Sequence, residues 1–529
     1  MSEWLGFKWI AEHTGIAPVQ PFRILSSLGS TRRSSIEDGF RHEVYPAQFT
    51  PAPTIPAHLA FALKYEVVHL EFLSRIFSAI DPGILAHWIR SEPTGAFARR
   101  ACFLYEWLTA KRLHAPDVTG GNYVDALQAD KYLTAARPQN NQRWRVRDNL
   151  PGTPIFCPVV YRTPGAENAS RYDCAESLKE LEVEYGPELL MRSAVWLTIK
   201  ESRASFAIEH EEDQVDRIRR FAAAMEQRCG QSEDPLDREA LTALQTDILG
   251  EVATRYGMRR SPVFVGHTAV YSEIVDYVAP HWNDTDALLQ GLRQCLAKTR
   301  SQSSVLRAAV ASFGFVYIHP MADGNGRISR FLVNDVLRRD GAVPAPFILP
   351  ISATITNTSS AKVGYDRALE QFSRPLMRTY KSSCTFGKDR TYDDGVVSNF
   401  YFDRYDDALH AWKFPDLTTH AEYLGEVIQL TIESEMHKEA MYLRSLEQAR
   451  EGVKNSIEGP NVDIDRIIRS IKETGSWRVS NKLVKQFPAL ASTSVASNVA
   501  KAVRDAFNPA SEEGADDEPE DGPDERSAP

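Results

Sequence analysis

The sequence has few cysteines, and none of them are arranged for metal binding or a disulfide framework. The six cysteines are scattered along 529 residues without a C-x-x-C pair. That spacing argues against a zinc site or a disulfide-stabilised secreted domain and favours reduced, buried thiols. No apolar run reaches the length of a membrane span, and the start, Met-Ser-Glu-Trp, lacks the apolar region of a signal peptide. We therefore expect a cytoplasmic protein with no membrane contact.

Little net negative charge remains outside the last residues of the chain, because acids and bases nearly balance there. The formal net charge is −10, but residues 511–529 carry nine acids against Arg526, a net −8, which leaves −2 for the rest. This tail also has no aromatic residue, so we expect residues 509–529 to be disordered. The remainder has an ordinary globular composition, with 43% hydrophobic and 25% charged residues overall. A chain of this length is expected to form several domains.

The most informative stretch is residues 319–330, which read His-Pro-Met-Ala-Asp-Gly-Asn-Gly-Arg-Ile-Ser-Arg. Gly324, Asn325 and Gly326 offer three successive backbone amides with little side chain in the way. An apolar stripe at helical spacing follows them, formed by Ile328, Phe331, Leu332 and Val336. The amides therefore lie at the start of a helix, where free N–H groups and the helix dipole favour phosphate.

Four charged or titratable side chains surround these amides in the sequence. Arg327 and Arg330 are three residues apart, so both can point at one anion. Asp323 can hold the divalent cation that usually accompanies phosphates. His319, with an ordinary pKa near 6.5, can accept a proton from a hydroxyl at neutral pH. A glycine-rich loop between two core helices is the alternative, but it explains none of these groups.

This stretch resembles the signature of the Fic family, His-Pro-Phe-x-(Asp/Glu)-Gly-Asn-Gly-Arg-x-x-Arg. Only Met321 departs from it, and methionine is an adaptable apolar substitute for the usual phenylalanine. The resemblance implies an all-helical core that moves AMP from ATP to a protein hydroxyl. It implies that His319 is the base and that Asp323 binds Mg²⁺. It assigns the phosphates to Gly324, Asn325, Gly326, Arg327 and Arg330.

A second stretch, Ser205-Phe-Ala-Ile-Glu209, is similar to the inhibitory helix of the same family, (Ser/Thr)-x-x-x-Glu-(Gly/Asn), with His210 in place of Gly or Asn. The resemblance implies that Glu209 pairs with Arg330 and blocks productive ATP binding. A carboxylate can do this because it competes with phosphate for the same guanidinium. Two alternatives stay open: a solvated glutamate at a helix end, or an inhibitory role for Asp38 in Ser34–Gly39.

Two β-prone runs, Pro262–Gly266 and Val270–Val278, predict a hairpin joined by residues 267–269. Its place between two core helices resembles the Fic flap, which binds a target segment by strand addition. Val265, Gly266 and His267 are the candidate flap residues. An exposed turn histidine without a role is an equally good interpretation of His267.

Helical periodicity elsewhere predicts an all-α, multidomain protein with a Fic helical-bundle core and a short β-hairpin flap. Residues 461–508 carry eight bases against four acids and resemble a helix-turn-helix or winged-helix unit, for which DNA binding follows only by analogy. A dimerisation or substrate-docking unit is the alternative. The expected domains are an N-terminal helical domain (1–113), an irregular connecting region (114–186), a Fic domain with its inhibitory helix (187–380), a helical connector (381–460), a winged-helix-like unit (461–508) and an acidic tail (509–529).

The resemblance makes the chain a protein adenylyltransferase that uses ATP and Mg²⁺ to modify a Ser, Thr or Tyr hydroxyl of a partner protein, with Glu209 as its internal inhibitor. Three alternatives stay open: removal of AMP from a modified protein, use of another nucleotide donor, and a DNA-binding regulator with a nucleotide-sensing core. No G-x-x-x-x-G-K-(S/T) motif is present, which excludes a P-loop ATPase. A homodimer is compatible with the sequence.

Overall fold

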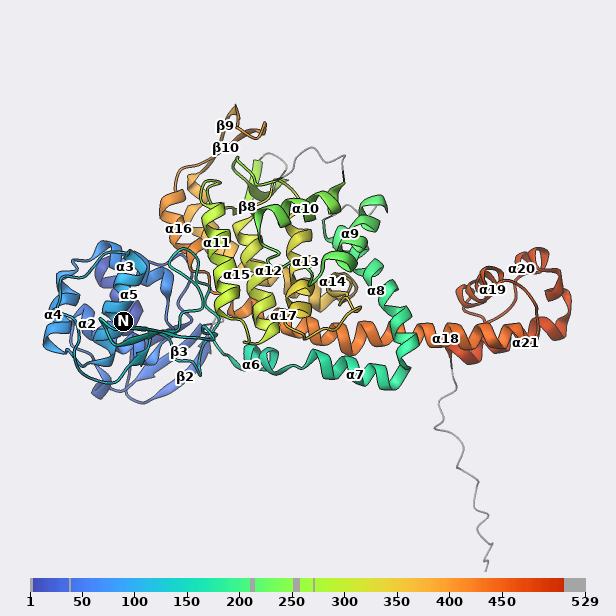
Figure 1. Cartoon of the computed structure of the whole chain (residues 1–529), viewed down its shortest axis with the longest axis horizontal. Helices are drawn as coiled ribbons and strands as arrows, with labels where there is room; N and C mark the ends of the chain where they lie inside the picture. Colours follow the sequence, from blue (N-terminus) through green and yellow to red (C-terminus); the bar gives the residue numbers. More distant parts are fainter. Residues whose placement is uncertain (1–2, 38–39, 210–214, 251–256, 270–271, 509–529) are drawn as a thin grey trace, which may run out of the picture. The chain divides into compact units, whose positions relative to one another are not determined.

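The computed structural model describes residues 3–37, 40–209, 215–250, 257–269 and 272–508 (Figure 1). They form two compact units. Unit 1 comprises residues 1–179 and 194–435, and unit 2 comprises residues 180–193 together with the chain from 436 onward. Both are mainly helical, as expected. Among the described residues, no helix has the length and apolar character needed to cross a bilayer.

The N-terminal part of unit 1 contains a small sheet that helical periodicity did not predict. Its strands run in the order β1-β3-β2, with β1 and β3 parallel and β2 antiparallel to β3. The helices expected for the N-terminal domain are present from α2 to α5. The elements are α1 (Gly6–Thr14), β1 (Ile24–Leu28), β2 (Arg33–Glu37), β3 (Phe40–Tyr45), η1 (Ala47–Phe49), α2 (Ile55–Tyr65), α3 (Leu70–Ala79), α4 (Gly83–Ser91) and α5 (Ala96–Thr109).

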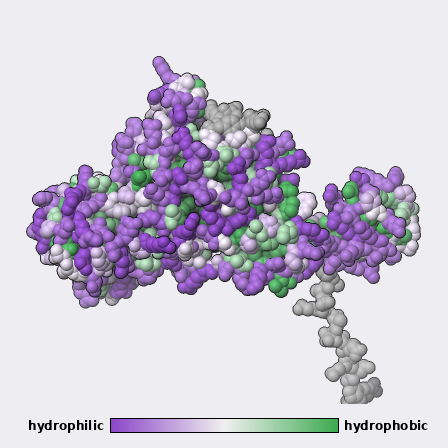
Figure 2. All heavy atoms as spheres, viewed as in Figure 1, coloured by the Kyte–Doolittle hydropathy of each residue, from purple (hydrophilic) through white to green (hydrophobic). Residues whose placement is uncertain are grey.

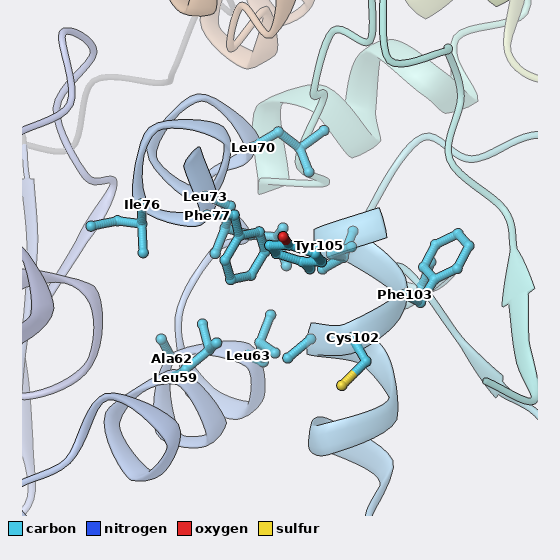
Figure 3. Packing of buried hydrophobic residues seen from close by; sticks show 14 of the residues in the cluster. Leu59, Ala62, Leu63, Leu70, Leu73, Ile76, Phe77, Cys102, Phe103 and Tyr105 are labelled. Atoms are coloured by element: carbon cyan, nitrogen blue, oxygen red, sulfur yellow. The ribbon is translucent and has the colours of Figure 1, made fainter. Parts of the chain in front are cut away.

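The apolar faces of α2, α3 and α5 meet in one core (Figure 3). Leu59 and Leu63 of α2 lie near Phe77 of α3, whose ring meets that of Tyr105 edge to face at 5.8 Å. The same core includes Trp144, so the region expected to be an irregular connection packs against the N-terminal helices. That region contains a sheet of three short strands, arranged β4-β6-β5. The strands are β4 (Val124–Asp125), β5 (Gln139–Asn141) and β6 (Val146–Asp148).

The rest of unit 1 is built around α12 and α13, the yellow helices in the middle of the unit in Figure 1. Almost every side chain of α12 is buried, as expected for a helix that is apolar on all sides. The helices lying wholly or partly in this unit are α6 (Pro164–Arg171), α7 (Cys174–Tyr185), α8 (Pro187–Ile208), α9 (Val215–Arg228), α10 (Arg238–Leu249), α11 (Thr285–Lys298), α12 (Ser304–Ile318), α13 (Asn325–Arg339), α14 (Ile351–Asn357), α15 (Ser359–Tyr380), α16 (Tyr405–Lys413) and α17 (Thr418–Leu430). Residues 180–193, at the end of α7 and the start of α8, belong to unit 2.

Two antiparallel hairpins complete unit 1. The first, β7 (Phe264–Ala269) with β8 (Ser272–Val278), is the predicted flap. The second, β9 (Cys384–Thr391) with β10 (Val397–Phe402), follows η2 (Lys381–Ser383), so the start of the connector expected to be helical at residues 381–460 is a hairpin. Phe264 of the flap packs on Phe400 and Phe386 of the second hairpin, with ring centroids 4.6 and 5.5 Å away. Aromatic stacking therefore joins the two hairpins at their bases.

Unit 2 contains three α-helices in residues 461–508, the segment that resembles a helix-turn-helix or winged-helix unit. They follow a π-helical turn, η3 (Thr431–Met436), and α18 (His437–Lys454). Their core is formed by Ile464, Ile467, Ile468, Ile471, Leu483, Leu490, Val499 and Val503. No strand occurs among the described residues of this unit, so the wing of a winged helix is not seen. The elements are α19 (Asn461–Glu473), α20 (Asn481–Gln486), η4 (Pro488–Ala491) and α21 (Thr493–Phe507).

Candidate active site

The loop between α12 and α13 carries the motif residues and is held in a tight conformation. His319 ends α12 with φ 49°, and Gly324 precedes α13 with φ 82°, both in the left-handed region. Glycine adopts this region freely, whereas histidine needs supporting contacts. Asn325 closes the loop, because its side chain accepts from the Met321 amide (2.9 Å) and donates to the Met321 carbonyl (2.8 Å). Met321 itself is fully buried, so it serves as the apolar anchor.

His319 is placed to act as a neutral base. Its Nδ1 lies 3.3 Å from the carbonyl oxygen of Val316, an arrangement in which Nδ1 donates and Nε2 keeps its lone pair. Burial, together with the nearby positive charge of Arg259, lowers the pKa of His319 to about 4. The imidazole is therefore unprotonated at neutral pH, as proton acceptance requires.

Arg259 is a site residue that the sequence did not reveal. Its buried guanidinium donates to the carbonyls of His319 (2.6 Å), Ser261 (3.1 Å), Pro280 (2.6 Å) and, more weakly, Ile318 (3.4 Å). Burial lowers its pKa to about 10. No motif marks this arginine, because all four partners are backbone carbonyls that any sequence supplies. It joins both ends of the β7–β8 hairpin to the left-handed turn at His319.

Backbone contacts reinforce this connection between the flap and the motif loop. The Arg259 amide donates to the Pro320 carbonyl (3.0 Å), and the Ala322 amide donates to the Gly257 carbonyl (2.9 Å). Gln245 of α10 donates to the Asp323 carbonyl and accepts from the Gly257 amide. The chain that enters the flap is thus paired with the loop that holds the base.

The two arginines of the motif converge on α8. Arg330 donates through Nε to Ser205 Oγ (2.7 Å) and through Nη2 to the Ser205 carbonyl (3.0 Å) and to Glu209 Oε1 (2.7 Å). Arg327 Nη2 lies 3.7 Å from Glu209 Oε2 and 3.1 Å from Asp323 Oδ1, while its guanidinium stacks over the Phe206 ring at 5.0 Å. The contact between Glu209 and Arg330 that the sequence comparison implied is present.

The carboxylate of Glu209 lies at the first turn of α13, against the backbone where the sequence places phosphate. A β-carbon at Gly326 would clash with Glu209 Oε1, so only glycine permits this approach. Burial alone would raise the pKa of Glu209, but Arg330 and Arg327 outweigh burial and hold it below its ordinary value. Glu209 is therefore an ionised carboxylate at a site suited to an anion.

A second carboxylate, Glu201, secures α8 to the core about one turn before Ser205. It accepts hydrogen bonds from the amide and the hydroxyl of Ser352 at the start of α14, both at 2.6 Å. Complete burial raises its pKa to about 7. The neighbouring Lys200 reaches Glu435 at 2.7 Å. Neither contact was predicted, because the partners lie more than 150 residues away in the sequence.

Asp323 is exposed and accepts hydrogen bonds from the Gly324 amide and from Arg327. Among the described residues, no three His, Cys, Asp or Glu side chains are grouped as a metal site. Mg²⁺ is commonly held by one carboxylate together with phosphate oxygens and water. The residues therefore fit a magnesium ion that arrives with a nucleotide, and they do not form a protein-only metal cage.

The flap places His267 within a strand, not in the connecting turn that the sequence suggested. His267 pairs with Ile274 in the β7–β8 ladder, and its Nδ1 lies 2.9 Å from Asp276 Oδ2 on the exposed surface. The strand extends further than its β-prone residues indicate because cross-strand pairing continues to Ala269. Val265 is exposed, and a β-carbon at Gly266 would clash with the Ile274 carbonyl.

Two residues discussed from the sequence, His210 and Asp38, lie outside the described residues. The other motif residues come together on α8, α13 and the loop before α13. The flap residues stand apart on β7 and are linked to His319 through Arg259.

Comparison with known proteins agrees with the motif. Residues 235–337 match the model of the Fic/DOC family. The proteins called "Protein adenylyltransferase Fic" from Drosophila grimshawi and Drosophila virilis are each 37% identical over 105 residues, which is 19% of this chain and 20% of the relative. This chain therefore spans only about a fifth of the length of these curated relatives.

Two solved structures are similar in part. A Fic family protein from Desulfovibrio desulfuricans G20 shares 17% identity over 55% of this chain and 80% of its own, with a TM-score of 0.35. A Fic domain containing signaling protein from Bacteroides thetaiotaomicron shares 16% identity over 52% of this chain and 94% of its own, with a TM-score of 0.29. At such scores these likenesses add no support of their own.

The helical core and the glycine-rich motif loop agree with the match of residues 235–337 to the Fic/DOC family model.

Proposed function

We propose that this chain is a Fic-type protein adenylyltransferase that Glu209 holds in a restrained state. The names of the partial relatives support the transferase activity. The observation that carries the restraint is the position of the Glu209 carboxylate, bonded to Arg330 and pressed against Gly326. An anion from the protein itself thus lies at the helix N-terminus where the phosphates of ATP would bind.

In the proposed reaction a Ser, Thr or Tyr hydroxyl of a partner protein attacks the α-phosphorus of ATP. His319 Nε2 takes the hydroxyl proton as the new O–P bond forms and the bond to pyrophosphate breaks. Arg327, Arg330 and the amides of residues 324–326 hold the phosphates and stabilise the charge that develops on them. Mg²⁺ held by Asp323 would supply further charge neutralisation when bound.

Restraint follows from competition for Arg330. The bond between Arg330 Nη2 and Glu209 must break before that donor can bind a phosphate of ATP. A charge-assisted hydrogen bond contributes about 1.5–3 kcal/mol. Loss of the Glu209 bond alone should therefore raise the fraction of productive complexes substantially, while Ser205 continues to position the guanidinium.

The same groups favour one alternative, the removal of AMP from a modified protein. The negative charge of Glu209 acts on His319 and raises its pKa against the larger effects of burial and Arg259. A carboxylate this close to the base could orient an attacking water. The motif is suited to phosphates and does not distinguish nucleobases, so another nucleotide donor such as UTP is also compatible with it.

The test is incorporation of label from α-labelled ATP into protein, with and without cell extract, in the presence of Mg²⁺. Wild type, Glu209→Gly and His319→Ala are compared, with Glu233→Gly as a matched control at an exposed bend of the same unit. The proposal expects strong labelling only by Glu209→Gly and no labelling by His319→Ala. Labelling from γ-labelled ATP would instead indicate phosphorylation. If no form labels protein with either ATP or UTP, the result would favour AMP removal, and the next experiment would use a target protein that already carries AMP.

A further inference from the structure

The exposed side of α21 in unit 2 is lined by polar side chains without a carboxylate over its first nine residues. Ser494, Ser497, Asn498 and Lys501 are exposed and lie three or four residues apart, on one side of the helix. The opposite side, with Val499 and Val503, is buried against the core of the unit. A surface of this kind can donate and accept hydrogen bonds but offers no apolar anchor.

The charge around α21 is opposite in sign to that of the whole chain. Between residues 474 and 504 there is no Asp or Glu, whereas the chain as a whole carries a formal charge of −10. Five bases fall in this interval: Arg478, Lys482, Lys485, Lys501 and Arg504. Arg504 is paired with the adjacent Asp505, and residues 461–508 as a whole carry eight bases against four acids, a net charge of +4. A net positive segment in an acidic protein is an electrostatic footprint for a polyanion.

The preceding helix supplies cations from the same small fold. Lys482 and Lys485 of α20 are exposed and three residues apart, so they share one side of that helix. Leu483, between them, packs into the core that also holds Leu490 and Val499. The order α20, η4, α21 thus arranges a lysine-bearing helix and a polar helix around one core, as in helix-turn-helix domains.

The composition of the exposed side distinguishes a nucleic acid from a protein partner. Protein-docking helices present apolar or aromatic anchors at helical spacing, and the exposed side of α21 has none. The surface of unit 2 in the view of Figure 2 is largely hydrophilic. Asparagine and lysine at adjacent turns are side chains that read adenine and guanine edges in a major groove.

We propose that unit 2 binds double-stranded DNA, with α21 in the major groove, Asn498 and Lys501 at the base edges, and Lys482 and Lys485 on the phosphates. This activity is separate from nucleotide transfer in unit 1. Phosphate contacts would supply most of the affinity, and the side chains of α21 would supply the sequence preference.

The test is fluorescence anisotropy of the full-length chain with a labelled random-sequence duplex at 50 and 200 mM salt. If Lys482 and Lys485 each neutralise one phosphate, affinity should fall by about 12-fold over this interval. Lys482→Gln with Lys485→Gln should lower the slope of log affinity against log salt by about two. Lys482→Arg with Lys485→Arg should restore it. Asn498→Ala should alter the duplex sequences selected from a random pool without changing that slope.

Arg466→Gln, on the exposed side of α19, is the matched control for removal of a base and should leave binding unchanged. His319→Ala should bind DNA as wild type does, whatever the transferase assay shows. Equal losses from Arg466→Gln and the Lys482/Lys485 variant would contradict the proposal. Equal binding of single-stranded DNA, or displacement of the duplex by poly-glutamate at equal charge, would show a general polyanion surface and would also overturn it.

Discussion

Arg259 and Arg330 are both buried guanidinium groups beside the same loop, but they are held in different ways. Arg259 donates only to backbone carbonyls, at the two ends of the flap and at His319. Arg330 donates to a serine and a glutamate on a separate helix, α8. A phosphate can displace the glutamate from Arg330, because both are anions, whereas nothing in a nucleotide replaces three carbonyls. The contacts of Arg259 are therefore fixed, whereas the contact between Arg330 and Glu209 can be exchanged for a contact with phosphate.

The largest effect should come from the base on the fixed side. His319→Ala should lower the initial rate of AMP incorporation by about 10²–10⁴-fold, because it removes the proton acceptor. The rate is measured in the Glu209→Gly background, where activity is highest. An unchanged thermal unfolding curve is the control, since His319 is only partly buried.

On the exchangeable side, Glu209→Gly should raise the rate about 10- to 100-fold, as expected for loss of one charge-assisted hydrogen bond. Ser205→Ala removes a neutral partner of the same arginine and should change the rate less than Glu209→Gly does. If both variants gave the same gain, packing of α8 and not anion competition would be the cause of the restraint.

Arg259→Met should shift the pH dependence of catalysis. Burial and, after it, the charge of Arg259 lower the pKa of His319 to about 4, so removal of that charge should move the acid limb of the rate profile to a higher pH. Arg259→Lys keeps the charge and should keep the limb near its original position, even if kcat falls. An acid limb that stays in place in both variants would mean that Arg259 acts only on the flap.

The smallest effect concerns the attachment of α8. Glu201 has a pKa of about 7 in the fold, above its ordinary 4.5, so its contribution to stability is complete below pH 4.5 and is lost as the pH rises through 7. The shift corresponds to at most about 3 kcal/mol. Glu201→Gln stays neutral, and its melting temperature should fall less than that of wild type between pH 5 and 8. Equal falls would show that Glu201 does not titrate in this range.

The sequence indicated the chemical groups of the motif because they lie within twelve consecutive residues, where local geometry decides their arrangement. The position of Glu209 followed from a family resemblance and not from helical periodicity. Arg259 and the Glu201–Ser352 contact could not be predicted, since they depend on distant backbone groups brought together by folding. The strands of β1–β3 and β9–β10 were missed for a related reason: β9, for example, is almost entirely exposed and lacks an apolar alternation.

The most direct test of exchange at Arg330 compares the binding of ATP with Mg²⁺ to wild type and to Glu209→Gly. Calorimetry measures the affinity, and the ³¹P signal reports the environment of the γ-phosphate. His319→Ala is included in both forms so that no turnover occurs. We predict tighter binding and a displaced γ-phosphate signal only when Glu209 is absent. Equal affinity and an identical γ-phosphate signal in the two forms would contradict competition between Glu209 and phosphate for Arg330.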